Sequence, residues 1–127
     1  MIDATSLRIG NVILDRGYQP FLIETEMELS AIYDIPEDFH PLPITEYRLR
    51  EMGFKVTKGP DQLDMYFMEL LYFPDLSVTV NPVWTKERFD FGLPEQKTVP
   101  IKYVHELQNL IFDHTGQEVP VGLDPMP

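Results

Sequence analysis

The sequence KYVHELQNLIFDHTG, residues 102–116, carries the clearest structural signal in the chain. One helix face is formed by Val104, Leu107, Ile111 and His114, which recur at helical spacing, and Leu110 widens this stripe. Gly116 follows as a residue suited to a left-handed C-terminal stop. We therefore predict an amphipathic helix from Lys102 to Thr115 that packs across one face of a small sheet.

That sheet is expected to begin near the N-terminus with a hairpin. Residues 7–14 are rich in β-branched side chains, and Gly10 marks a bulge or a close backbone approach. Residues 15–17 suit a turn in which the glycine adopts a positive φ. Residues 21–29 alternate between apolar and polar positions, which predicts a second strand with one face in water. The water-facing carboxylates on this strand are Glu24, Glu26 and Glu28.

The middle of the chain predicts one short helix and several further strands. Residues 30–43 contain three prolines and suit a loop, after which Thr45 is an N-cap for a helix that Gly53 ends. Strands are predicted at 54–56, 76–80 and 88–92. Residues 63–73 fit either a strand or a helix, and their aromatic content favours a strand.

These elements define an α+β fold with a mostly antiparallel sheet. The chain has 127 residues, 43% of them hydrophobic, which suits one packed domain. We expect that domain to cover residues 1–118 and a proline-rich tail to follow at 119–127. The early strand is also compatible with an SH3-like roll at the N-terminus.

The charge of the chain is strongly acidic and unevenly placed. Asp and Glu number 21 against 10 Lys and Arg, a net charge of −11. A run of acids without an intervening base includes Glu24, Glu26, Glu28, Asp34, Glu37 and Asp38. Proteins that bind nucleic acid directly carry clustered Lys and Arg, so direct binding of DNA or RNA is not expected. The run is either a solvated surface or a face that docks a basic partner.

Composition also bears on compartment. Cysteine is absent, which removes disulfides and thiolate chemistry and suits a cytoplasmic protein. There is no apolar run of the length that crosses a bilayer, so no membrane association is expected.

The residue patterns of common enzymes are missing. His105 and His114 are nine residues apart, on opposite faces of one predicted helix, and do not suit one metal ion. No serine lies in a nucleophile elbow, and no glycine-rich phosphate loop occurs. We therefore predict no catalytic residue, no metal and no cofactor.

One aromatic residue stands out as a candidate interface anchor. Trp84 lies between Pro82 and Lys86, in a predicted loop, and tryptophan is enriched where proteins bind one another. We predict Trp84 as the apolar part of a protein interface and the strand-borne Glu24, Glu26 and Glu28 as its charged part.

Three motifs, in this order, resemble those of a known group of proteins. They are Leu7-Arg8-Ile9-Gly10-Asn11, then Pro43-Ile44-Thr45-Glu46 with a helix ending at Gly53-Phe54, then Ile101 to Leu110 with Thr115-Gly116. The chain resembles a family of short, uncharacterised bacterial proteins associated with phages and mobile elements. The resemblance implies a compact domain and brings no catalytic residues with it.

These features together predict a non-catalytic binding or adaptor protein of the cytoplasm. One alternative is an acidic inhibitor that imitates nucleic acid and occupies a basic protein. A second alternative is a small hydrolase built on a carboxylate pair, which requires two facing acids, one with a raised pKa.

Overall fold

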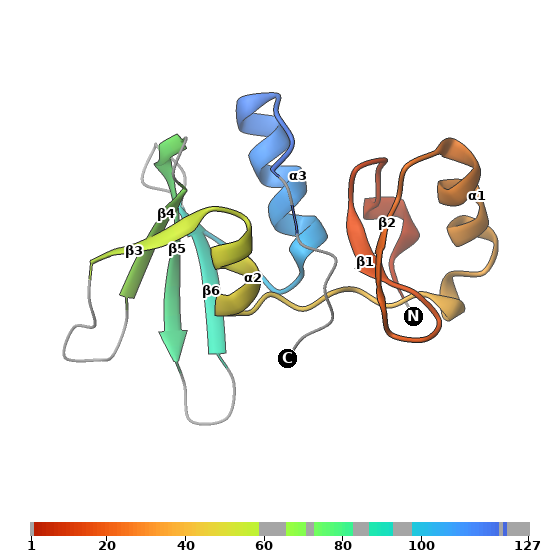
Figure 1. The fold of residues 1–127 in the computed structure, drawn as a ribbon, viewed down its shortest axis with the longest axis horizontal. Helices are drawn as coiled ribbons and strands as arrows, with labels where there is room; N and C mark the ends of the chain where they lie inside the picture. Colours follow the sequence, from red (N-terminus) through yellow and green to blue (C-terminus); the bar gives the residue numbers. More distant parts are fainter. Residues whose placement is uncertain are drawn as a thin grey trace. The chain divides into compact units, whose positions relative to one another are not determined.

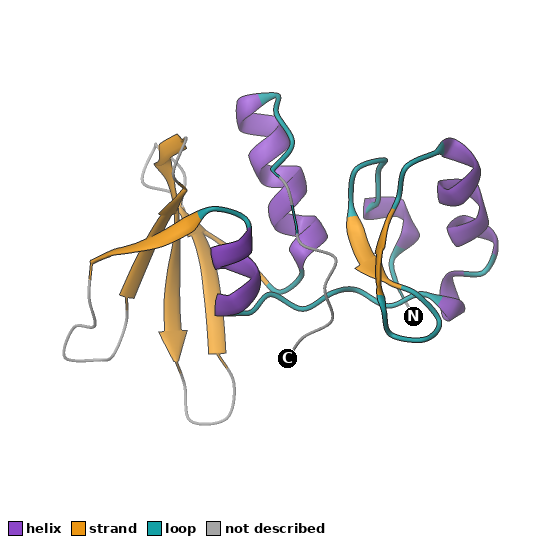
Figure 2. Cartoon of the chain, in the orientation of Figure 1, coloured by secondary structure: helices purple, strands orange, loops and turns teal. Residues whose placement is uncertain are grey.

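The computed structural model describes residues 2–58, 66–70, 73–82, 87–92, 98–119 and 121. The fold is α+β, as predicted, and divides into two compact units. The terminal unit joins both ends of the chain, residues 1–43 and 103–127. The central unit is the continuous segment 44–102. Figures 1 and 2 show the helices and strands of each.

The terminal unit holds a small hairpin and the longest helix. Its elements are η1 (Ala4–Ser6), β1 (Val12–Leu14), β2 (Pro20–Leu22), α1 (Glu26–Asp34), η2 (Pro36–Asp38) and α3 (Val104–Thr115). β1 and β2 pair antiparallel, which confirms the predicted hairpin, and α3 packs against β1. α3 also confirms the predicted C-terminal helix, with Gly116 at a φ of 71° as its left-handed stop. This sheet has two strands, too few for the SH3-like roll that the sequence suggested.

The predicted strand over residues 21–29 is wrong beyond Leu22. Residues 26–34 form α1 instead, and Thr25 is its N-cap. The Thr25 hydroxyl accepts a hydrogen bond from the Glu28 N–H at 3.1 Å, and the Glu28 carboxylate accepts one from the Thr25 N–H at 3.1 Å. This reciprocal capping box satisfies the first turn of a helix and outweighs the alternating pattern. Glu24, Glu26 and Glu28 therefore do not share a strand face.

The first predicted strand is also shorter than expected. Only residues 12–14 of the stretch 7–14 form a strand, and η1 and a turn precede them. Gly10 has a φ of 101°, and a Cβ there would lie 2.9 Å from a carboxylate oxygen of Glu118. The close approach expected at this glycine is therefore present.

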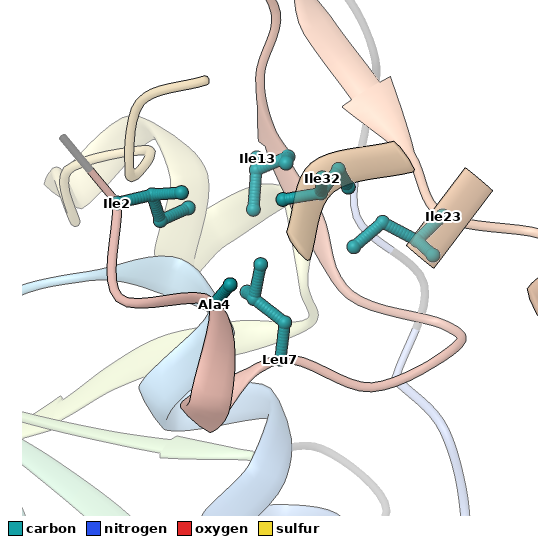
Figure 3. Close-up of a cluster of buried hydrophobic side chains, with 6 residues drawn as sticks. All are labelled: Ile2, Ala4, Leu7, Ile13, Ile23 and Ile32. Carbon is teal, nitrogen blue, oxygen red and sulfur yellow. The ribbon is translucent and has the colours of Figure 1, made fainter. Parts of the chain in front are cut away.

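One hydrophobic cluster holds the terminal unit together (Figure 3). Its buried members come from η1, the hairpin, the segment after β2 and α1: Ile2, Ala4, Leu7, Ile13, Ile23 and Ile32. Phe21, Leu29 and Phe39 pack against this cluster. One face of α1 thus packs against the cluster, and its opposite face is exposed to water.

The central unit is a five-stranded antiparallel meander with one short helix. Its elements are α2 (Glu46–Glu51), β3 (Phe54–Lys58), β4 (Tyr66–Leu70), β5 (Phe73–Pro82), β6 (Glu87–Gly92) and β7 (Thr98–Ile101). The strands pair in chain order, from β3 to β7. One sheet face is apolar and mostly buried, as at Met68, Val78 and Phe91, which lie opposite one another.

Most predictions for this unit are confirmed. Thr45 caps α2, Gly53 takes a φ of 100°, and α2 packs beside β3. Residues 66–70 are a strand, which settles that part of the ambiguous stretch. The strands predicted at 76–80 and 88–92 lie within β5 and β6, which pair antiparallel, whereas β7 was not predicted from the sequence.

Burial continues past the expected end of the domain. Val119, the first residue of the expected proline-rich tail, is buried in the terminal unit. The rest of the tail, apart from residue 121, lies outside the described residues.

Candidate functional site

The outer surface of α1 combines acidic and apolar side chains. Met27 is 81% exposed on the helix, and Tyr33 and Ile35 are 49% and 42% exposed at its end. Such large apolar groups in water are informative when they gather on one element. Exposed acids lie between and beside them, at Glu24, Glu26, Asp34 and Glu37. We call these seven side chains the α1 surface.

The sequence around the α1 surface contains no basic residue that could neutralise its acids. From residue 17 to residue 47 the chain contains neither lysine nor arginine. Glu28 differs from its neighbours because its carboxylate also accepts a hydrogen bond from the Glu24 N–H at 3.0 Å. Of the three glutamates predicted as an interface, Glu24 and Glu26 are thus free to face a partner, and Glu28 holds the helix start.

A strained turn lies between β1 and β2. The Asp15 carboxylate accepts hydrogen bonds from the N–H groups of Gly17 and Gln19, at 2.8 and 3.0 Å. The positive φ of this turn, 60°, falls on Tyr18 and not on Gly17, where the sequence led us to expect it. A side chain in this conformation costs roughly 1–2 kcal/mol. The turn therefore retains a tyrosine at a position that glycine or asparagine would fill at lower cost.

The Tyr18 ring lies flat on His40. The two ring centroids are 4.3 Å apart with an interplanar angle of 8°, and Tyr18 remains 64% exposed. His40 is held in place because its backbone exchanges two hydrogen bonds with Leu14 of β1, at 2.8 and 2.9 Å. Two segments about twenty residues apart in sequence thus present one stacked pair, which we call the Tyr18–His40 stack.

A buried polar network joins α3 to the N-terminal segment. Gln108, 3% exposed, accepts a hydrogen bond from the Val12 N–H at 2.9 Å and donates one to the Gly10 carbonyl at 3.0 Å. Asn11, fully buried, donates to the Asn109 side chain at 2.9 Å. The sequence motifs at residues 7–11 and 101–110 therefore meet, and their polar residues stabilise the fold.

Arg8 completes this network at its edge. Its guanidinium pairs with Glu118, donates to the Gln108 carbonyl at 3.2 Å and lies 4.3 Å from the centre of the Phe112 ring. Arg8 is thus occupied within the terminal unit. A second arginine, Arg48 of the central unit, lies 5.6 Å from the Tyr47 ring centre.

Among the described residues, Ser6 and His105 lie close enough to be compared with a catalytic serine and its base. The Ser6 hydroxyl lies 3.3 Å from His105 Nε2 and donates to the Asp3 carbonyl at 2.8 Å. Its proton is therefore directed away from the histidine. His105 Nδ1 is buried without a hydrogen-bond partner, so no carboxylate orients the ring as a triad requires.

The shifted pKa values in this corner agree with a structural role. Burial lowers the pKa of His105, because desolvation outweighs the attraction of the Glu106 and Asp3 carboxylates. Hydrogen bonds from the Thr5 side chain and backbone lower the pKa of Asp3. The two histidines lie on opposite helix faces, but His105 is the buried one and His114 is exposed, the reverse of what a stripe through Ile111 and His114 predicts.

The remaining predicted sites have the following outcomes. Trp84 lies outside the described residues. Within the described ranges, no group of three His, Cys, Asp or Glu side chains is arranged to hold a metal ion. No helix in the part of the chain that the structure describes is long and apolar enough to cross a membrane.

No protein-family model, curated protein or solved structure matches the chain. Function is therefore inferred from the side chains themselves. The sequence reasoning missed Met27, Tyr18 and His40 as functional candidates. A signal for Met27 was present, since Thr25 and Glu28 have capping-box spacing and place Met27 in a helix. For Tyr18 and His40 no local signal exists, because their stacking depends on tertiary contact.

Proposed function

We propose that this chain is a non-catalytic binding protein that docks a basic, amphipathic segment of another protein on the α1 surface. The observation that carries the proposal is the exposure of Met27, at 81%, among acids in a stretch without bases. The apolar side chains of such a partner would cover Met27, and its cationic side chains would neutralise the surrounding acids. The absence of cysteine and the phage-associated resemblance make a cytoplasmic, mobile-element setting part of the same proposal.

A protein partner is favoured over imitation of nucleic acid. A phosphate mimic needs a regular series of free carboxylates, and Glu28 is engaged at the helix start. Large apolar side chains, at Met27 and Tyr33, interrupt the acidic series. Apolar groups in the middle of a polar surface are typical of a protein interface.

The test uses an amphipathic peptide with leucine on one helix face and lysine and arginine on the other. Titration calorimetry at low salt should detect binding to the whole chain, and added salt should weaken it. The matched peptide with glutamate in place of the basic residues should not bind. Failure of the basic peptide to bind at low salt would contradict the proposal.

Two variants locate the binding on α1. Met27→Gln keeps helix propensity and length, and we expect about a tenfold loss of affinity from the lost apolar contact. Glu26→Gln with Asp34→Asn should cost roughly fivefold, at about 0.5 kcal/mol for each screened pair. These two changes have opposite effects on the helix dipole, so stability should barely move.

A control pair removes the same charge elsewhere. Glu69→Gln with Asp113→Asn lowers the net negative charge equally, in β4 and α3. We expect the affinity of this variant to remain near that of the wild type. An equal loss in both double variants would mean that only the overall charge attracts the peptide, and the α1 surface would be excluded.

A further inference from the structure

The turn between β1 and β2 presents an aromatic ring that its own folding does not need. Tyr18 has a φ of 60° while Gly17 lies next to it, so the backbone conformation gives no reason for a large side chain. Strained positions persist where the surroundings determine them, and they gather at functional sites. The ring itself is therefore the feature that requires an explanation.

The ring is presented in a fixed orientation. One face of Tyr18 lies on His40, with centroids 4.3 Å apart, and Tyr18 is 64% exposed. His40 is anchored to β1 by its two backbone hydrogen bonds with Leu14. A side chain held in this way can receive a flat group on its outer face without losing rotamer freedom on binding.

The chemistry of the outer face favours a cation. The face of an aromatic ring carries negative charge density, and planar guanidinium groups stack on it. Acids lie close in sequence to both members of the stack, with Asp15 three residues before Tyr18 and Asp38 two residues before His40. A nucleobase would bring its phosphates into this acidic segment, so stacking of nucleic acid is disfavoured.

The chain itself shows that its arginines use this chemistry. Arg8 lies over Phe112 and Arg48 lies near Tyr47. Among the described side chains, no arginine lies over Tyr18. Arg16, in the same turn, is exposed. A partner arginine would therefore have to bind the outer face of Tyr18 more strongly than Arg16 of the chain itself can.

We infer that the Tyr18–His40 stack binds an arginine side chain of the docked protein. This inference rests on the proposed function and adds a specific contact to it. It predicts that the partner segment contains arginine at this contact, and that lysine is a poor substitute because an ammonium group lacks the planar face.

The test compares two peptides of equal length and charge, an arginine–alanine peptide and a lysine–alanine peptide. Titration calorimetry at low salt should show about threefold tighter binding of the arginine peptide. Tyr18→Gly removes the ring and suits the positive φ, so the Tm should stay the same or rise. In this variant the arginine preference should disappear, whereas the lysine peptide should bind as before.

Further variants guard against an indirect effect. Tyr18→Asn also suits the positive φ and should behave like Tyr18→Gly, whereas Tyr18→Phe should keep the preference. Tyr47→Ala, which removes an exposed tyrosine of the central unit, should leave both affinities unchanged. A shift of the Tyr18 ring signals in NMR spectra on adding the arginine peptide should accompany binding.

The outcomes separate this inference from the proposed function. If both peptides bind equally to the wild type, or if Tyr18→Gly retains the arginine preference, the stack is not the contact. Weakening of both peptides by Glu26→Gln with Asp34→Asn would then still support the α1 surface. If neither alanine peptide binds at low salt, the contact at the stack is wrong, and the leucine-bearing basic peptide then decides the proposed function: binding of that peptide supports the α1 surface, and its failure to bind contradicts the docking function as well.

Discussion

The central unit is one continuous segment whose strands pair in chain order, whereas the terminal unit joins the two ends of the chain. In the central unit, stability comes from a backbone ladder between neighbours and from apolar residues on one sheet face. In the terminal unit, side-chain hydrogen bonds connect residues about one hundred positions apart, as between Gln108 and Val12. Closing so long a loop is entropically costly, so contacts of high specificity are needed to secure it.

Within the terminal unit, the residues that stabilise the fold differ from those that are candidates for binding a partner. The exposed features that point to a partner, Met27 and the Tyr18–His40 stack, lie in the terminal unit. The buried polar groups of that unit are used for its own cohesion. We therefore expect substitutions in the network to change stability and substitutions on the outer surface to change binding.

The largest expected effect on stability comes from Gln108→Leu. The change leaves the Val12 N–H and the Gly10 carbonyl without their hydrogen bonds in a buried place. At about 1–3 kcal/mol for each of these two groups, the free energy of unfolding should fall by roughly 2–6 kcal/mol. Urea denaturation would measure the loss, and hydrogen exchange should accelerate in β1 and α3 more than in β4 and β5.

The control for this change is Gln117→Leu. Gln117 is exposed, so its substitution should alter the free energy of unfolding by less than about 0.5 kcal/mol. If Gln108→Leu behaves like this control, the polar network does not hold the two chain ends together.

A smaller effect should follow acidification. The native pKa of His105 lies below its ordinary value of 6.5, so the native state binds fewer protons than the unfolded chain in mild acid. Stability contributed by neutral His105 is complete above pH 6.5 and is lost as the pH falls toward the native pKa. The slope for one such group does not exceed about 1.4 kcal/mol per pH unit.

Two histidine variants isolate this contribution in urea denaturation at several pH values. His105→Gln should remove the slope, and His114→Gln, at an exposed position, should keep it. The titration of Asp3 does not interfere, because its lowered pKa places its loss of stability below pH 3.8. An unchanged slope in His105→Gln would show that another group is responsible.

The smallest effect is expected at the β5–β6 pairing of the central unit. A Cβ on Gly92 would lie 2.6 Å from the Ser77 hydroxyl oxygen, directly across the ladder. In Gly92→Ala the serine must leave its rotamer, at a cost of about 0.5–1.5 kcal/mol. Adding Ser77→Ala removes the clash, so the double variant should be more stable than Gly92→Ala in thermal unfolding. Equal Tm values for the two would mean that Ser77 does not restrict this position.

Elements with local signals were predicted well, and α1 shows how such signals compete. α2 and α3 carry an N-cap or a left-handed glycine next to a helical pattern, and both helices are present. Around Thr25 the sequence also contained a capping box, but the alternation over residues 21–29 favoured a strand. Within so short a stretch, alternation does not exclude a helix packed by one edge, where Ile32 is buried and Met27 is exposed.

The amino-acid sequence by itself determined the α+β class, the strong acidity and the position of the C-terminal helix. Each depends on composition or on residues within one or two helical turns of each other. Tertiary structure alone decided that Gln108 and Asn11 are buried partners of the opposite chain end, and that Tyr18 stacks on His40. Such contacts depend on how distant segments meet, and a polar or aromatic residue has the same local pattern whether it is buried or faces a partner.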